Sequence, residues 1–465
     1  MKRNRKAFRA NFGILSILTV VVLLDASAVL AADAPNVKQE FPRLGGIQIG
    51  KNPFAGGYAD PAYQLQIARL DLVLIGGTGH GRALNDYAAA IKTMNPQIVI
   101  GQYSNIAETF MNANGVSAQY REKLDSEKGP NTTNAHDWWL RDVDGNKIEI
   151  WPGTYRTNLT DYVKPDRNGD RWPEWRAKQD YQVWFNDDVW DFSYSDLASW
   201  KPKFRNQGLI GDYSGGNVTN DSEIHAAYRR GTVAYWNEIR RLSPNMLISA
   251  NHNWYLFDDA DKRLDLKEYK NQANGGILER IMGFEKTVES NHGWATLYRY
   301  YGWTMEYFVD PKIVIFNVEG EVDDYQFFRY SFATCLMNDA FFDYSPSSEY
   351  LFGTVEWFDE FDLAGKADTN WLGRSVSKPP TRPWQKGVYR RDFENGIALV
   401  NPRGNGTVTI TVEDGYRRID GQQDRSVNNG KAVKRITLQD ADGIVLISDT
   451  PRKPKKRPKA PVMRN

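Results

Sequence analysis

The feature that most constrains the fold is an alternation of short apolar runs with longer amphipathic stretches, over roughly residues 40–370. Eight runs have the composition of strands: 44–50, 71–77, 97–105, 209–211, 245–253, 274–283, 312–321 and 339–346. Helical patterns precede most of them, at 61–70, 83–94, 221–242, 293–309 and 323–337. Strand–helix alternation predicts a parallel sheet, and eight repeats predict an α/β fold, the (β/α)8 or TIM-type barrel.

One connection in this pattern is too long for an ordinary loop. Residues 106–206 are rich in aromatic and polar side chains, and we expect this insertion to carry its own local structure. Within it, Asp144 and Gly145 lie between two short polar–apolar runs, which predicts a tight hairpin.

The alternation stops near residue 384. From there the sequence shows short β-type runs separated by Gly, Asn and Asp, with no helical pattern between them. We therefore expect a barrel domain over 32–375, followed by a small C-terminal antiparallel β-sandwich over 384–448. Residues 449–465 form a basic, proline-containing tail that cannot build a core.

The first 31 residues have the pattern of a secretory signal peptide. A basic head precedes the apolar run 12–24, and Ala31 closes a small-residue cleavage pattern. An uncleaved anchor is the alternative. We expect export to the periplasm or the extracellular space. With Cys335 as the only cysteine, an internal disulfide is excluded.

The charge balance argues against a nucleic-acid partner. Residues 1–31 hold five basic residues and one acid, and 451–465 hold seven basic residues; the remainder has 47 basic and 57 acidic residues, a net charge of about −10. The tail could contact an anionic envelope or polysaccharide, or it could simply be solvated. The sequence does not indicate an oligomeric state.

Aromatic side chains are abundant, with 15 tryptophans and 24 tyrosines. Trp138, Trp139 and Trp151 lie among charged residues, Gly and Pro, which favours a rim of rings that stack on sugars. The alternative is that these rings fill a core.

The stretch GLIGDYSGG, residues 208–216, presents an acid at the end of a short apolar run. A buried strand is apolar on both faces, so Asp212 must open onto a cleft or find partners. The next helix starts near Asp221, too far away for Asp212 to cap it. Catalytic groups of barrels occupy such strand ends. The alternative for Asp212 is a structural ion pair.

Further polar residues fall at the expected strand ends. Three are acids, and each has a structural alternative: Glu279 could pair with Arg280, Glu319 could favour a helix N-terminus, and Asp343 could be a turn residue. We expect Asp212, Glu279 and Glu319 to be catalytic. The expected substrate-binding residues are His80, Tyr103, Trp139, Trp151, Tyr213, Asn251, Asn253 and Asp343.

The sequence lacks the motifs of other catalytic classes. The five histidines show no zinc-binding spacing, there is no nucleophile elbow or Walker loop, and Gly76–Gly79 lacks the spacing of a dinucleotide fingerprint. We therefore expect no metal and no cofactor.

Several motifs together resemble those of an uncharacterised group of glycoside hydrolases with a (β/α)8 barrel and a C-terminal β-domain. They are DWWLRDVDGNKIEIWPGTYRTNLTD at 137–161, GLIGDYSGG, GGILERIMG at 275–283 and KGVYRRDFENGIALVNP at 386–402. The resemblance covers roughly residues 40–447. It implies a nucleophile on the fourth strand, here Asp212, and a proton donor on a later strand, here Glu279.

The sequence thus favours a secreted glycoside hydrolase that cleaves a polysaccharide with a pair of carboxylates. Two alternatives stay open: a non-catalytic carbohydrate-binding or polysaccharide-assembly protein on the same scaffold, and a lyase or transferase acting on polysaccharides.

Overall fold

The computed structural model describes residues 35–50, 54–112, 115–127, 137–142, 146–198, 221–252, 266–283, 287–346 and 353–452. The chain divides into two units, residues 1–33 and 34–465, and all described residues belong to the second. The expected signal peptide and most of the basic tail lie outside the described residues. Among the described helices, none is long and apolar enough to cross a membrane.

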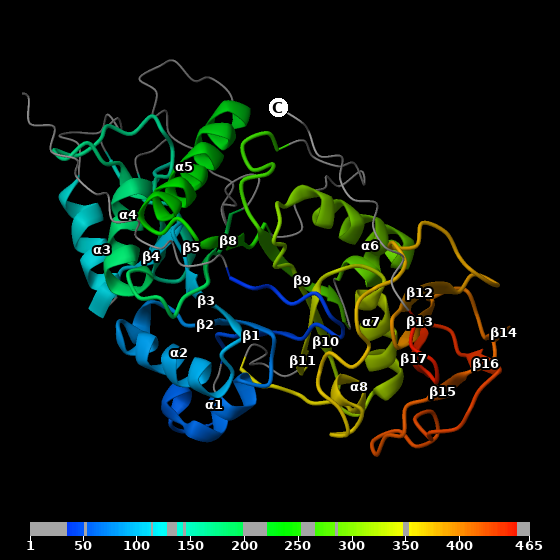
Figure 1. The fold of residues 1–465 in the computed structure, drawn as a ribbon. Helices are drawn as coiled ribbons and strands as arrows, with labels where there is room; N and C mark the ends of the chain where they lie inside the picture. The colour runs from blue at the N-terminus through cyan, green and yellow to red at the C-terminus, as the bar shows by residue number, and fades with distance from the viewer. Residues whose placement is uncertain are drawn as a thin grey trace, which may run out of the picture. The chain divides into compact units, whose positions relative to one another are not determined.

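Eight parallel strands form the central sheet of this unit (Figure 1). In spatial order they are β1 (Gly45–Gln48), β2 (Leu72–Ile75), β3 (Val99–Ser104), β7 (Phe192–Ser195), β8 (Leu247–Ala250), β9 (Gly275–Met282), β10 (Ile315–Gly320) and β11 (Phe341–Pro346). A parallel bridge between Leu44 and Phe342 joins the first strand to the last. The predicted barrel is confirmed.

The helices between the strands follow the sequence pattern closely. They are α1 (Pro61–Ile67), α2 (Ala83–Met94), α5 (Asp221–Leu242), α6 (Val288–Tyr307) and α7 (Tyr325–Leu336). Asp60 caps α1 by accepting a hydrogen bond from the Ala62 amide at 2.9 Å. In α6, Gly293 has φ 78°, so a short turn capped by Thr287 precedes the helix expected from residue 293.

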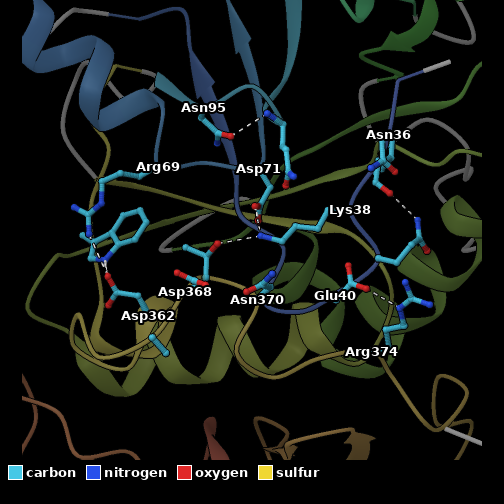
Figure 2. Close-up of a pocket in the computed structure, with 16 residues that line it drawn as sticks. Asn36, Lys38, Glu40, Arg69, Asp71, Asn95, Asp362, Asp368, Asn370 and Arg374 are labelled. Atoms are coloured by element: carbon cyan, nitrogen blue, oxygen red, sulfur yellow. Dashed lines mark hydrogen bonds and ion pairs between the residues drawn. The ribbon is translucent and has the colours of Figure 1, made fainter. Parts of the chain in front are cut away.

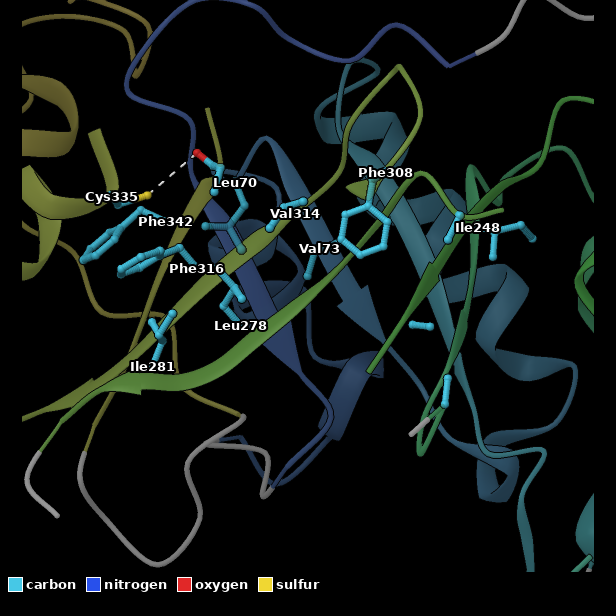
Figure 3. Packing of buried hydrophobic residues seen from close by; sticks show 14 of the residues in the cluster. Leu70, Val73, Ile248, Leu278, Ile281, Phe308, Val314, Phe316, Cys335 and Phe342 are labelled. Atoms are coloured by element: carbon cyan, nitrogen blue, oxygen red, sulfur yellow. Dashed lines mark hydrogen bonds between the residues drawn. The ribbon is translucent and has the colours of Figure 1, made fainter. Parts of the chain in front are cut away.

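Two apolar layers hold the barrel. Ile47, Leu72, Leu74, Val99, Phe192, Leu247, Ile277, Ile315 and Phe341 fill its interior. A second cluster joins residues on the opposite faces of the strands to residues of the helices, and Figure 3 shows part of it, including Val73, Ile248, Leu278 and Phe316. A Cβ atom on Gly101 would lie 2.0 Å from the Phe192 ring, so glycine is required where this ring crosses β3.

The fourth strand differs from the expectation. We predicted it at 209–211, residues that lie outside the described part of the chain, but the strand that joins β3 to β8 is β7, Phe192–Ser195. Phe192 faces the interior, while buried Ser195 accepts a hydrogen bond from the Trp236 indole at 3.1 Å. Because the Ser195 hydroxyl has a partner in the helix layer, the buried strand can hold this serine without a continuous apolar run.

The insertion therefore ends before residue 192. It contains β4 (Glu108–Phe110), α3 (Gly115–Ser126), β5 (Glu149–Trp151), β6 (Thr154–Arg156), α4 (Trp172–Asp180) and a π-helical turn, η3 (Tyr181–Phe185). Its strands form an antiparallel sheet in the order β4–β6–β5. Arg141 and Lys147 pair across the expected hairpin, whose turn residues Asp144 and Gly145 lie outside the described residues.

The C-terminal strands form two antiparallel sheets, which confirms the expected β-domain. Their members are β12 (Tyr389–Phe393), β13 (Gly396–Asn401), β14 (Val408–Thr411), β15 (Tyr416–Arg418), β16 (Arg435–Leu438) and β17 (Asp442–Ser448). A short helix, α8 (Asp359–Asp362), precedes them. Buried Arg391 on β12 donates a hydrogen bond to the Leu336 carbonyl of α7 at 3.0 Å, which ties the β-domain to the barrel. The exact domain boundaries stay predictions.

Candidate functional site

Asp196 follows β7 directly and stands at the carboxyl end of the barrel. Its carboxylate accepts hydrogen bonds from the Tyr103 hydroxyl at 2.5 Å and from the Leu197 amide at 2.8 Å, and it also bonds the Asn251 side chain. Leu197 has φ 54°, the left-handed region that a branched side chain rarely adopts. Such local strain concentrates at functional sites.

Glu279 belongs to β9 and faces the same amide group. The Asn251 Nδ2 atom donates to Glu279 Oε2 at 2.8 Å. The register explains how the carboxylate is presented: between the pairs Phe316–Leu278 and Val318–Met282, three residues of β9 oppose the single residue Asn317 of β10. The result is a bulge, a feature that redirects side chains next to active sites.

Arg280 completes this bulge. It has φ 49°, and its amide donates to Asn317 Oδ1 at 2.8 Å. Within the described residues, its guanidinium forms an ion pair with Glu319 of β10 and not with its neighbour Glu279. The alternative in which Glu319 favours a helix N-terminus also fails, because Glu319 lies within β10 and Asp324 caps α7.

The two carboxyl groups differ in their environments. Burial raises the pKa of Glu279, and the charge of Asp196 raises it further, while a hydrogen bond from Asn251 and the charge of Arg280 oppose the shift. Burial also raises the pKa of Asp196, but this carboxylate accepts hydrogen bonds from Tyr103, Leu197 and Asn251. Hydrogen bonds to the ionised form favour that form, so the surroundings of Asp196 favour its ionised form more than those of Glu279 do.

Two tyrosines form an aromatic wall beside the carboxyl groups. The rings of Tyr103 and Tyr194 stack with centroids 5.5 Å apart and planes inclined by 29°. Burial raises the pKa of both phenols well above the ordinary value, so both stay neutral and able to donate. Tyr103 and Asn251 were expected at the same end of the barrel as Glu279. Their hydrogen bonds to Asp196 and Glu279 agree with that expectation.

Asp343 lies inside the barrel, within β11 and not in a turn. Asn317 Nδ2 donates to Asp343 Oδ2 at 2.7 Å and lies 3.1 Å from Ser345 Oγ. Burial raises the pKa of Asp343 to about 7. This places a carboxyl group that titrates near neutrality on the strand next to β10.

We expect Asp343→Asn to change the pH dependence of stability. The folded pKa exceeds the unfolded one, so the ionised group destabilises the fold increasingly as pH rises from about 4 to about 7, by at most about 4 kcal/mol. The melting temperature of Asp343→Asn, relative to wild type, should therefore rise over this range and level off above it. Exposed Asp188→Asn is the control, and an equal difference at pH 5 and pH 8 would contradict the expectation.

The aromatic candidates divide into two groups. Trp138 and Trp139 are fully buried, and the Trp139 indole donates to Asp125 Oδ1 at 3.1 Å. The expectation that they are exposed stacking platforms is wrong, because partners inside the insertion satisfy their polar edges. Trp151 is 55% exposed and remains a predicted platform. His80 follows β2, is exposed, and packs edge-on against Tyr58 at 5.1 Å.

Asp212, Tyr213 and Asn253 lie outside the described residues, and their roles remain predictions from the sequence. The structure adds Asp196, Tyr194, Glu108 and Arg156, which the sequence reasoning missed. A signal for Asp196 was present, since DFSYSD ends in an acid after alternating aromatic and small residues, but it was assigned to the insertion.

A polar cavity of about 560 Å³ lies elsewhere in the barrel, near the starts of β1, β2 and β3 (Figure 2). Lys38 pairs there with Asp71, just before β2, and also bonds Thr369 at 3.0 Å. The Arg69 guanidinium lies 3.4 Å from the centroid of the Trp357 ring. These groups satisfy one another at the amino ends of the strands, away from Asp196 and Glu279.

Comparisons with known proteins concern the fold. No family model matches the sequence, and no curated protein matches it significantly. The glycoside hydrolase domain of PelA from Pseudomonas aeruginosa aligns with 67% of this chain and 98% of its own length, at 10% identity and a TM-score of 0.40.

Two larger proteins align over more of the chain. The GH36 alpha-galactosidase AgaA from Geobacillus stearothermophilus aligns with 88% of this chain and 56% of its own length, at 11% identity and a TM-score of 0.44. A cyclomaltodextrinase aligns with 90% of this chain and 76% of its own, at 9% identity and a TM-score of 0.45. The chain is thus similar in structure to barrel domains of glycoside hydrolases, at low sequence identity.

Proposed function

We propose that the protein is a glycoside hydrolase in which Asp196 and Glu279 divide the work of a carboxylate pair. The observation that carries the proposal is the shared contact with Asn251: two carboxyl groups from neighbouring parts of the barrel mouth bond one amide, yet differ in their other hydrogen bonds. Glycosidic cleavage needs one neutral and one ionised carboxyl group across the scissile bond.

In this mechanism Glu279 donates its proton to the leaving oxygen. Asp196, held ionised by Tyr103, Leu197 and Asn251, faces the anomeric carbon as nucleophile or as the stabilising charge. Because one amide contacts both groups, the two carboxyl groups lie close together, which favours retention of the anomeric configuration, since inverting enzymes leave room for a water molecule.

The proposed substrate is an exported polysaccharide or its oligosaccharides. The apolar run and cleavage pattern of residues 1–31 support export, and exposed Trp151 supports binding to a sugar ring. Asp212 remains a further candidate acid from the sequence. The basic tail, residues 449–465, is proposed as a contact for an anionic polymer.

A screen on bacterial exopolysaccharides and plant glycans tests this function. We expect the purified protein without residues 1–31 to release saturated reducing ends from one polymer, and early product observed by proton NMR to keep the anomeric configuration. Asp188→Asn, an exposed carboxylate before β7, is the matched control and should stay active. An unsaturated product would indicate a lyase, and binding without release would indicate a non-catalytic protein.

A further inference from the structure

A third carboxyl group, Glu108, lies next to the candidate pair but has no part in the mechanism above. It belongs to β4 of the insertion and not to the barrel. Its Oε1 atom accepts a hydrogen bond from Asn105 Nδ2 at 2.7 Å. Its Oε2 atom is buried and has no hydrogen-bond partner among the described residues. A buried carboxylate oxygen without a donor is costly unless the group is neutral or has a role.

The pairing of β3 with β7 places Glu108 close to Asp196. Ser104 of β3 pairs with Ser195 of β7, and the Asp196 amide donates to the Ser104 carbonyl at 2.8 Å. Asn105, whose amide donates to Glu108, is the first residue after β3, and Asp196 is the first residue after β7. The two residues therefore leave paired strands at the same level of the sheet. The chain around Asn105 is fixed, since Arg176 Nη1 donates to its carbonyl at 3.2 Å.

Glu108 also faces a cation across the insertion sheet. In the register of β4 and β6, Glu108 opposes Arg156, whose side chain is 1% exposed. The charged and titratable groups around Glu108 are Arg156 from β6, Asp196 after β7, Tyr103 from β3 and Tyr228 from α5.

These groups act on Glu108 in opposite directions. Burial raises its pKa to about 7, the charge of Asp196 adds to this shift, and Arg156 and the Asn105 hydrogen bond oppose it. The desolvation therefore outweighs the arginine. Glu108 therefore gains or loses its proton near neutral pH, and its negative charge disfavours the negative charge of Asp196.

We propose that Glu108 is a positioning residue of the catalytic pair: by holding or losing a proton beside Asp196, it sets the charge against which Asp196 and Glu279 ionise. Neutral Glu108 leaves Asp196 as the single negative charge of the cluster. Ionised Glu108 disfavours a further negative charge and so strengthens proton binding by Glu279. The insertion thus contributes a residue to the site. The role of this residue in catalysis rests on the proposed function.

Chemical labelling tests the charge coupling without any substrate. A water-soluble carbodiimide with an amine modifies protonated carboxyl groups, and peptide mass spectrometry reports the pH midpoint for Asp196 and Glu279 separately. In Glu108→Gln we expect the Glu279 midpoint to fall by roughly one pH unit, since a nearby negative charge is gone. Glu149→Gln, an exposed glutamate on β5 of the same small sheet, should leave it unchanged.

Asn105→Ala is a second variant in case Glu108→Gln does not fold. Removing the amide donor keeps Glu108 neutral to higher pH, so the Glu279 midpoint should again fall, by a smaller amount. Equal midpoints in wild type and in the folded variants would overturn the proposal. If the wild-type protein hydrolyses a substrate but the midpoints do not shift in the variants, the proposed role of Glu108 is overturned and the proposed function stands. If the midpoints shift but no hydrolysis is found, the role of Glu108 stands and the result counts against the proposed function.

Discussion

Asp196→Asn is expected to lower kcat by about 10³-fold or more on any polysaccharide that the wild-type protein cleaves. The amide keeps the shape of the side chain and can still bond Tyr103 and Asn251, but it removes the charge that attacks or stabilises the anomeric centre. Because the shape is kept, KM should change little. Initial rates of reducing-end release at saturating substrate measure the effect.

The melting temperature provides the necessary control for this variant. Asp196 is partly buried and its pKa is raised by burial, so the neutral amide should not destabilise the fold. A folded Asp196→Asn protein with near-normal turnover would exclude Asp196 as a catalytic group. Asp212, the acid predicted from the sequence, would then be the next residue to test.

Asp180→Asn is expected to destabilise the protein by about 3–5 kcal/mol, the usual cost of removing one partner of a buried ion pair. The carboxylate of Asp180 is fully buried and accepts hydrogen bonds from Arg176 Nε at 2.7 Å and Tyr235 Oη at 2.7 Å. It also accepts from Tyr120 Oη at 2.6 Å and Ser104 Oγ at 3.0 Å. The variant would leave the buried Arg176 charge without its counter-ion.

This network connects β3, α3, α4 and α5, so its loss should loosen the insertion from the barrel. Denaturant unfolding followed by tryptophan fluorescence measures the change, because Trp172 and Trp184 are buried nearby in the same chain segment. Asp161→Asn, which breaks the exposed pair with Arg230, should cost less than about 1 kcal/mol. Equal losses in the two variants would contradict the structural role of Asp180.

Much of the barrel could be predicted from the sequence, because seven of its strands lie in largely apolar runs and helical patterns precede most of them. The strand at 192–195 could not, since Ser193 and Ser195 interrupt the apolar pattern at buried positions, and the partner of Ser195, Trp236, lies far along the chain. The same reasoning explains Trp139: charged neighbours suggested an exposed ring, but Asp125 reaches its indole inside the insertion.

The candidate site shows the same division. Glu279 and Asn251 were predicted from their positions at strand ends, and the structure brings them within 2.8 Å of each other. The bulge at Arg280 and the position of Glu108 opposite Arg156 depend on pairing between strands far apart in the sequence. No local pattern encodes such pairing, so these parts of the site could only come from the structure.

The central claim is that Asp196 and Glu279 play different roles, and the leaving group tests it most directly. The measurement compares kcat/KM of wild type, Asp196→Asn and Glu279→Ala on a cleaved polysaccharide or its oligosaccharides and on a matched aryl glycoside. An aryl leaving group needs little protonation, so Glu279→Ala should lose far less activity on the aryl glycoside than on the sugar polymer, whereas Asp196→Asn should lose activity on both. Equal losses for Glu279→Ala on both substrates, or activity retained by Asp196→Asn, would contradict the account.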